Sequence, residues 1–128
     1  MYNLFRIVSR HKTKKRVNVN YELQKEKTRG IVISRLLHFN QYYNFKYNRV
    51  AIRDQKSRWG SCSSKLNLNF NYRVGLLPEY LMDYVIVHEL CHLAEMNHGA
   101  KFWELVSEVI PDYNARREGL KKIDIRKM

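Results

Sequence analysis

Two kinds of apolar spacing follow one another along the chain, and each predicts a different element. A helix over residues 21–43 is predicted because apolar residues recur there every three or four positions, on one face. These residues are Val32, Leu36, Phe39 and Tyr43. Gly30 weakens the middle of this helix, so its stable part is expected to begin only after that residue.

Shorter stretches follow in which every second residue is apolar, which is the period of a half-buried strand. Residues 49–54 and 65–70 both show it, and turn-forming residues 56–64 join them. A hairpin or short meander is therefore expected, with Trp59 as a large apolar anchor. The apolar faces consist of Val50 and Ile52 in the first strand and of Leu66, Leu68 and Phe70 in the second.

The second half of the chain predicts helices. Pro78 suits the first turn of a helix over 78–95. A second helix over 100–109 and a last one over 112–122 are expected, separated by Pro111. Helix, strands and then helices predict a single α+β domain over 21–128. A basic N-terminal arm over 1–20 precedes it, with a short edge strand or an extended segment at 17–20.

The most apolar of these helices contains the run His-Glu-Leu-Cys-His at residues 88–92. Residues four apart lie on one helical face, so His88 and His92 can bind the same ion. Glu89 lies one residue further round, where it can reach a water on the ion. Asn97 and Gly99 allow the chain to turn and bring His98 back toward the ion. This spacing is typical of zinc hydrolases and predicts one Zn²⁺ per chain.

Two other interpretations of the histidines were weighed. A histidine on an apolar helix is more often a core residue, but burying His88, Glu89 and His92 together is costly without compensation by a metal or hydrogen bonds. A fourth protein ligand would close the site and make it structural. The side chains available for that are Cys91, Cys62, His38 and His11. Cys91 is expected in the core, and a reducing cytoplasm disfavours a Cys62–Cys91 disulfide.

The 128-residue chain has a net charge of +12 that is concentrated at its two ends. Residues 1–30 contain nine Lys or Arg residues and residues 116–128 contain six, whereas residues 31–115 are nearly neutral. Basic termini attract anionic partners such as nucleic acid, but solvated surface charge is the preferred explanation because no basic-aromatic alternation typical of an RNA-binding sheet is present. No apolar run is long enough to span a membrane. Arg6 interrupts the N-terminal apolar patch, which argues against a signal peptide and predicts a cytoplasmic location.

Several motifs together resemble the YgjP-like (WLM/SprT-related) metallopeptidase domain family over residues 45–120. They are Arg58-Trp59-Gly60-Ser61-Cys62-Ser63, Leu66-x-Leu68-Asn69, Pro78, the run from Tyr84 to Leu93, Asn97-His98, Phe102-Trp103 and Pro111-Asp112. The resemblance implies a zincin-like fold, in which a small antiparallel or mixed sheet packs on the active-site helix. It also implies zinc held by His88, His92 and His98, with Glu89 as general base. Family proteins are usually longer, so this chain is expected to be shortened at its N-terminus.

The substrate class stays open at this point. Metallopeptidase activity on peptides or proteins is the first expectation, but some family members are described as nucleoside triphosphate pyrophosphatases. A non-catalytic, zinc-stabilised nucleic-acid-binding module is the third alternative.

Further site residues are predicted with less support. Arg58, Tyr113 and Arg116 can stabilise the transition state or contact substrate, although each is more often structural. The strand with outward-facing Asn67 and Asn69 can pair with an extended peptide. Glu95, Asp83 and Glu104 are the expected acceptors for the second nitrogen of a ligand histidine.

Overall fold

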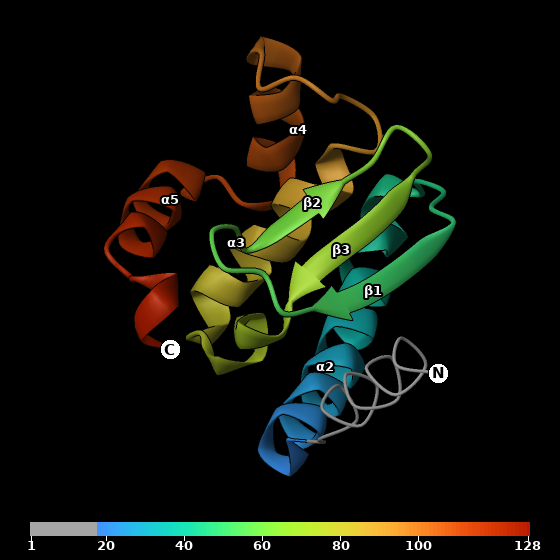
Figure 1. Cartoon of the computed structure of the whole chain (residues 1–128). Coiled ribbons are helices and arrows are strands. Elements are labelled where there is room, and N and C mark those ends of the chain that lie inside the picture. The colour runs from blue at the N-terminus through green and yellow to red at the C-terminus, as the bar shows by residue number, and fades with distance from the viewer. Residues whose placement is uncertain (1–17) are drawn as a thin grey trace, which may run out of the picture.

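The computed structural model describes residues 18–128 and has an α+β architecture (Figure 1). Residues 1–17, which include most of the predicted arm and His11, lie outside the described residues. A small sheet lies over the two longest helices, and two shorter helices follow toward the C-terminal end of the chain (Figure 1). The elements are α2 (Val19–Tyr43), β1 (Arg49–Arg53), β2 (Gly60–Cys62), β3 (Asn67–Asn71), a 3₁₀ turn (Tyr72–Leu76), α3 (Glu79–Cys91), α4 (Ala100–Val109), α5 (Tyr113–Lys121) and a second 3₁₀ turn (Ile125–Lys127).

Helix α2 is longer at its N-terminus than predicted. The Asn18 side chain accepts a hydrogen bond from the Tyr21 backbone N–H and caps the helix. The helix therefore begins at Val19, and the edge strand or extended segment expected at 17–20 is wrong for Val19 and Asn20. Gly30 does not interrupt the helix either, because burial of Val32 and Leu36 against the core stabilises the turns around it.

The sheet is mixed, in the order β1-β3-β2. Strands β1 and β3 run parallel, with Arg49 beside Asn67, so the expected hairpin between these two strands is wrong. The antiparallel partner is β2, a strand of three residues formed within the turn-rich connection. Strand β3 begins at Asn67 because Leu66 has a left-handed φ of 64°, outside the range of a strand.

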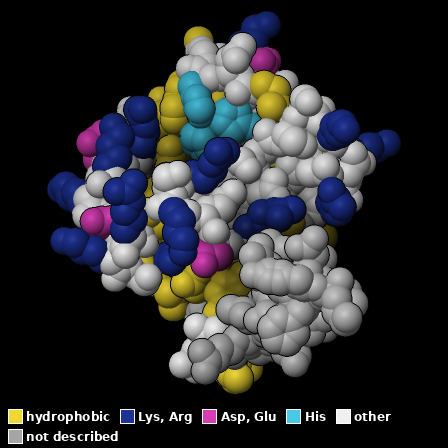
Figure 2. Space-filling model, in the orientation of Figure 1, with side chains coloured by type: hydrophobic (Ala, Val, Ile, Leu, Met, Phe, Trp, Pro, Cys, Tyr) yellow, Lys and Arg dark blue, Asp and Glu magenta, His cyan; other side chains and the backbone are white. Residues whose placement is uncertain are grey.

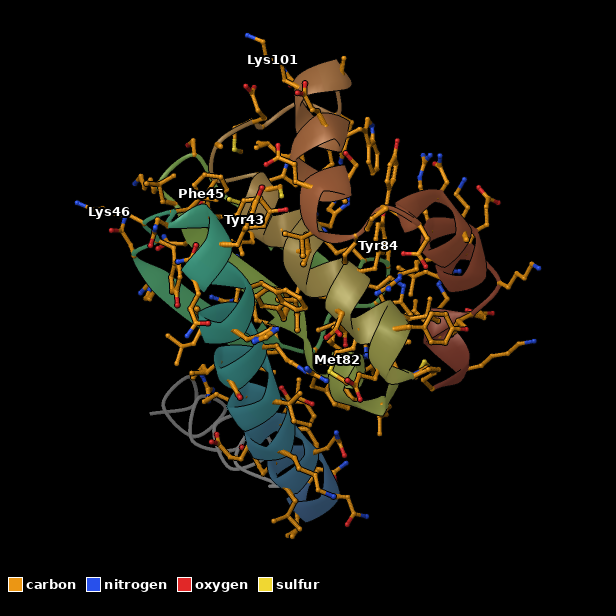
Figure 3. All side chains as sticks on the ribbon, turned by 180° about the vertical axis from the view of Figure 1, so that it is seen from behind. Tyr43, Phe45, Lys46, Met82, Tyr84 and Lys101 are labelled. Atoms are coloured by element: carbon orange, nitrogen blue, oxygen red, sulfur yellow. The ribbon has the colours of Figure 1, made fainter. Side chains whose placement is uncertain are left out.

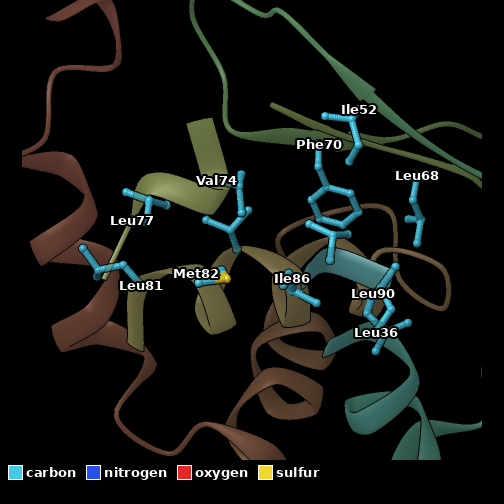
Figure 4. Close-up of a cluster of buried hydrophobic side chains, with 12 residues drawn as sticks. Leu36, Ile52, Leu68, Phe70, Val74, Leu77, Leu81, Met82, Ile86 and Leu90 are labelled. Atoms are coloured by element: carbon cyan, nitrogen blue, oxygen red, sulfur yellow. The ribbon is translucent and has the colours of Figure 1, made fainter. Parts of the chain in front are cut away.

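The main core lies between the sheet and helices α2 and α3 (Figure 4). Its fully buried side chains come from all of these elements and include Leu36, Leu68, Phe70, Val74, Ile86 and Leu90. Helix α3 runs beside α2, as the view from behind shows (Figure 3). Pro78 caps α3, and the helix ends at Cys91, four residues before the predicted end. The early end matters because the chain must turn back toward the helix before His98.

Replacing Leu36 tests the packing that holds α2 against α3. Leu36 is fully buried, whereas the next residue, Leu37, is 60% exposed. We expect Leu36→Ala to lower the free energy of unfolding by about 2–5 kcal/mol, because it leaves a cavity in the core. Leu37→Ala makes the same chemical change at the surface and is expected to cost less than about 0.5 kcal/mol. Urea unfolding of both variants measures the difference, and similar losses would contradict the described packing.

Candidate metal centre

Three histidines bring their Nε2 atoms to one point. The Nε2 of His92 lies 3.2 Å from that of His88 and 3.0 Å from that of His98, and the His88–His98 separation is 3.1 Å. His88 belongs to α3, and His92 follows the last helical residue with helical backbone angles (φ −65°, ψ −18°). The spacing of four residues therefore keeps the geometry predicted for a continuous helix. His98 approaches from the connection to α4 and is the exposed member of the group.

The donor set fits a metal ion. In a tetrahedral site with zinc–nitrogen bonds of about 2.0–2.1 Å, ligand nitrogens lie about 3.3–3.4 Å apart, close to the observed separations. His92 Nδ1 lies 2.9 Å from the Glu95 backbone oxygen. A carbonyl only accepts hydrogen bonds, so Nδ1 carries the proton and Nε2 presents a lone pair to the shared point. Lone pairs converging in this way are stabilised by a cation.

Aromatic side chains of α4 hold the imidazole rings in place. Phe102 is fully buried and stacks on His92 with a centroid separation of 4.3 Å. It also meets the rings of His88 and His98 edge-on, each at 5.0 Å. Trp103 stacks on His98 at 5.8 Å and on Tyr113 at 5.0 Å. The positions of all three histidines thus depend on the docking of α4 against α3.

Glu89 points into the same site from α3 and is 6% exposed. On the sheet, Gly60 of β2 lies close to its side chain. A Cβ at Gly60 would lie 3.0 Å from Glu89 Cγ and 2.9 Å from the Asn69 carbonyl oxygen, so a larger residue does not fit without movement. Glycine is needed here for close approach of the strand to the carboxylate. Gly60 is a site residue that the sequence motif contained but that our reasoning did not single out.

Burial controls the protonation of the site. Burial of Glu89 raises the pKa of its carboxyl group to about 8, although the positive charge of Arg58 acts in the opposite direction. Burial also lowers the pKa of His88 to about 3, and the neighbouring His92 and His98 add to that effect. The pKa of His92 is lowered by burial as well. Neutral imidazoles are the form that binds a metal.

A cavity of about 640 Å³ opens beside these residues. Its lining includes His88 and Glu89 from α3 and Arg58, Trp59 and Gly60 at the start of β2. The opposite wall comes from α5 and the segment after it, from Arg117 to Arg126. The cavity therefore reaches Glu89 and one of the three histidines, His88.

The other predicted site residues separate into two groups. Arg58 lines the cavity, within the electrostatic reach of Glu89. Tyr113 and Arg116 do not line it. Tyr113 reaches the site only through its stacking on Trp103. Arg116 pairs with Asp112 and donates to the Tyr80 backbone oxygen. The arginine of α5 that lines the cavity is the next one, Arg117, which sequence reasoning missed because the buried face of α5 was unknown.

The predicted peptide-pairing role of Asn67 and Asn69 is wrong. Both lie on β3, and β3 is the central strand, bonded to β1 on one side and to β2 on the other. Its backbone has no free edge for a substrate. Asn69 instead accepts a hydrogen bond from the Arg53 side chain.

The hydrogen-bond partners of the ligand histidines are also different from those predicted. Glu95 serves through its backbone oxygen rather than its carboxylate, and the second nitrogen of His88 meets the Tyr84 hydroxyl at 3.3 Å. Asp83 pairs with Arg35 instead. Cys62 and Cys91 are free thiols, so the two do not form a disulfide. Among residues 18–128, the metal-ligand group contains the three histidines and no fourth side chain.

Comparisons with known proteins identify metallopeptidases as similar to this chain. The model of a family described as "YgjP-like, metallopeptidase domain" matches residues 2–123. The metallopeptidase zymogen abylysin of Pyrococcus abyssi superposes with a TM-score of 0.65 and 25% identity, covering 71% of this chain and 92% of abylysin. The jannalysin zymogen of Methanocaldococcus jannaschii gives a TM-score of 0.54 and 28% identity, covering 73% and 91%. A search of curated proteins found no significant match.

Titration of Glu89 in the metal-free protein has a measurable effect on stability. Because its pKa is raised to about 8 in the folded state, the folded protein retains a proton that the unfolded chain loses above about pH 4.5. The stabilisation of the folded state by the neutral Glu89 carboxyl group is fully present below about pH 4.5 and is lost as the pH rises toward 8. We expect wild type to lose stability relative to Glu89→Gln by about 1.4 kcal/mol per pH unit across this range.

Urea unfolding of both proteins in the presence of a chelator, at several pH values from 4.5 to 9, measures this effect. The titration of His88 is common to the two proteins and cancels in the difference. A difference that does not vary with pH would mean that the buried carboxyl group is not held neutral.

Proposed function

The chain belongs to the YgjP-like metallopeptidase domain family, and we propose that it hydrolyses peptide bonds with one zinc ion held by His88, His92 and His98 and with Glu89 as general base. The observation that carries the proposal is the convergence of three imidazole Nε2 atoms, 3.0–3.2 Å apart, beside a buried carboxylate in an open cavity. A structural zinc site needs neither the open side nor the base.

Zinc supplies Lewis acidity at such a site, polarising a carbonyl and bringing the pKa of water close to neutrality. Glu89 accepts the proton of the attacking water and later donates it to the leaving amine. An opposite charge nearby favours the ionised carboxylate, so the proton that burial retains in the metal-free protein is more easily released in the loaded enzyme. Arg58, at the cavity wall, is placed to interact with the negative charge that develops on the substrate.

Strand β2 is the element that we propose to orient the substrate. It bonds to β3 along one edge, and among residues 18–128 no strand pairs with its other edge. An extended peptide laid along that edge passes Gly60, which contacts Glu89. This assignment replaces the pairing expected for Asn67 and Asn69.

Zinc is proposed over other divalent ions because three neutral imidazoles with an open position suit it well. Peptide hydrolysis is proposed over a nucleotide or nucleic-acid partner because it is the activity that the family description names. No helix in the described part of the chain is long and apolar enough to cross a membrane. A cytoplasmic location stays a prediction from the sequence.

Glu89→Gln separates metal binding from catalysis. We expect wild type and the variant each to retain about one zinc per chain by elemental analysis, because Glu89 is not a ligand. Cleavage of a synthetic peptide library, followed by mass spectrometry, is expected to fall about 10²- to 10⁴-fold in the variant. Glu104→Gln makes the same change at an exposed position of α4 and is expected to leave both measurements unchanged.

Two results would contradict the proposal. Peptide cleavage that survives Glu89→Gln would remove Glu89 from the mechanism. A zinc-loaded wild type that hydrolyses nucleoside triphosphates but no peptide would favour the pyrophosphatase alternative.

A further inference from the structure

The cavity beside the metal centre has a strongly basic wall. Five of its lining residues are basic: Arg58, Arg117, Lys121, Lys122 and Arg126. The acidic lining residues are Glu89, which belongs to the catalytic centre, and Asp124. Figure 2 shows dark-blue Lys and Arg side chains gathered over α5, beside the cyan histidines. Most of the basic side chains of the C-terminal segment therefore line the cavity beside the metal centre.

Most of this charge is not neutralised within the described part of the protein. Of the five basic residues, Lys121 has a carboxylate partner, Glu118 at 3.3 Å, and for the other four no ion pair is found among residues 18–128. The Asp124 side chain caps the Arg126 backbone N–H. Elsewhere, Arg35, Arg73 and Arg116 pair with Asp or Glu. Other basic residues away from the cavity, such as Arg49, Lys65 and Lys101, resemble the cavity residues in having no ion pair among residues 18–128, so it is the position of the unpaired charges beside the metal centre that distinguishes the cavity.

Helix stability explains only part of the pattern. Lys121 and Lys122 lie at the C-terminal end of α5, where cations interact favourably with the helix dipole. Arg58 and Arg126 lie outside that helix, and Arg117 lies in its middle. The Arg117 guanidinium is 5.3 Å from the centre of the Trp103 ring, which itself stacks on His98. This contact holds a positive charge close to the metal centre.

We propose that this basic wall, formed by Arg117, Lys121, Lys122 and Arg126, selects peptides that carry a carboxylate near the scissile bond. The inference rests on the proposed peptidase function and names its substrate class. A carboxylate within the cavity would gain charge-assisted hydrogen bonds from side chains that have few competing partners. A neutral peptide would gain no such contacts. Glutamate or aspartate side chains and a free C-terminal carboxylate supply the same chemistry.

The size of the selection follows from the exposure of these side chains. Solvent-exposed ion pairs are weak, so each contact is expected to change binding by only about two- to fivefold. Several contacts acting together give about a tenfold preference for acidic over neutral peptides at low ionic strength. Salt screens such interactions, so the preference should shrink as the salt concentration rises toward 1 M.

Binding to zinc-loaded Glu89→Gln tests the inference without requiring cleavage. The probes are fluorescein-labelled pentapeptide mixtures with a central Glu or Gln, each prepared with a free or an amidated C-terminus, and fluorescence anisotropy measures their affinity. Tighter binding of Glu over Gln in amidated peptides supports selection of side chains. Tighter binding of free over amidated Gln peptides supports selection of the C-terminus. Equal affinity for all four mixtures would overturn the inference.

A matched pair of variants separates the wall from the general positive charge of the protein. In the Glu89→Gln background, we expect Lys122→Gln to reduce the acidic-to-neutral affinity ratio by about two- to fivefold. Lys101→Gln makes the same change at the outer end of α4, where the side chain points away from the molecule (Figure 3). It should leave the ratio unchanged, and an equal effect of both variants would overturn the inference. Arg117→Gln provides a second wall position.

Peptide cleavage by wild type is measured in parallel. Cleavage without any preference for acidic peptides would contradict the basic wall and leave the peptidase function standing. Tighter binding of acidic peptides without any cleavage would support the basic wall and contradict the peptidase function.

Discussion

The convergence of three imidazole nitrogens is the constraint on which the rest of the site depends. Their Nε2 atoms lie 3.0–3.2 Å apart, so small shifts of any backbone segment would separate them. Two of the segments are fixed by α3, which is buried on nearly all sides by α2, α4 and the sheet. The third is fixed by Phe102, whose buried ring contacts all three histidines. The packing of the core therefore holds the three histidines in the positions that the metal centre requires.

The sheet contributes to the site through one close approach. Gly60 brings the β2 backbone against the side chain of Glu89. The same contact excludes water from one side of Glu89 and contributes to the burial that raises its pKa. A strand of only three residues is sufficient for this contact because its position, rather than its length, brings Gly60 against Glu89.

Sequence patterns predicted the parts of this structure that depend on local spacing. The helices and the relation of His88, Glu89 and His92 follow from helical periodicity, which packing preserved even though α3 ends at Cys91. The pairing of the strands did not follow, because parallel and antiparallel strands share the same alternation of apolar and polar residues. Asn67 and Asn69 were consequently placed on an edge strand, whereas β3 is central. Arg116 was preferred to Arg117 for a similar reason: adjacent helical residues point about 100° apart, and only tertiary contacts reveal which one faces the cavity.

The fold also changes the meaning of the charge distribution. In the sequence, the basic residues after position 115 look like a terminal extension remote from the catalytic motif. Because α5 packs against α3, four of them line the same cavity as His88 and Glu89, namely Arg117, Lys121, Lys122 and Arg126. In the proposed hydrolase, a positive field there would stabilise the negative charge that develops on a substrate during hydrolysis. Substrate selection and catalysis would then draw on the same electrostatic field, so a change that weakens one is expected to weaken the other.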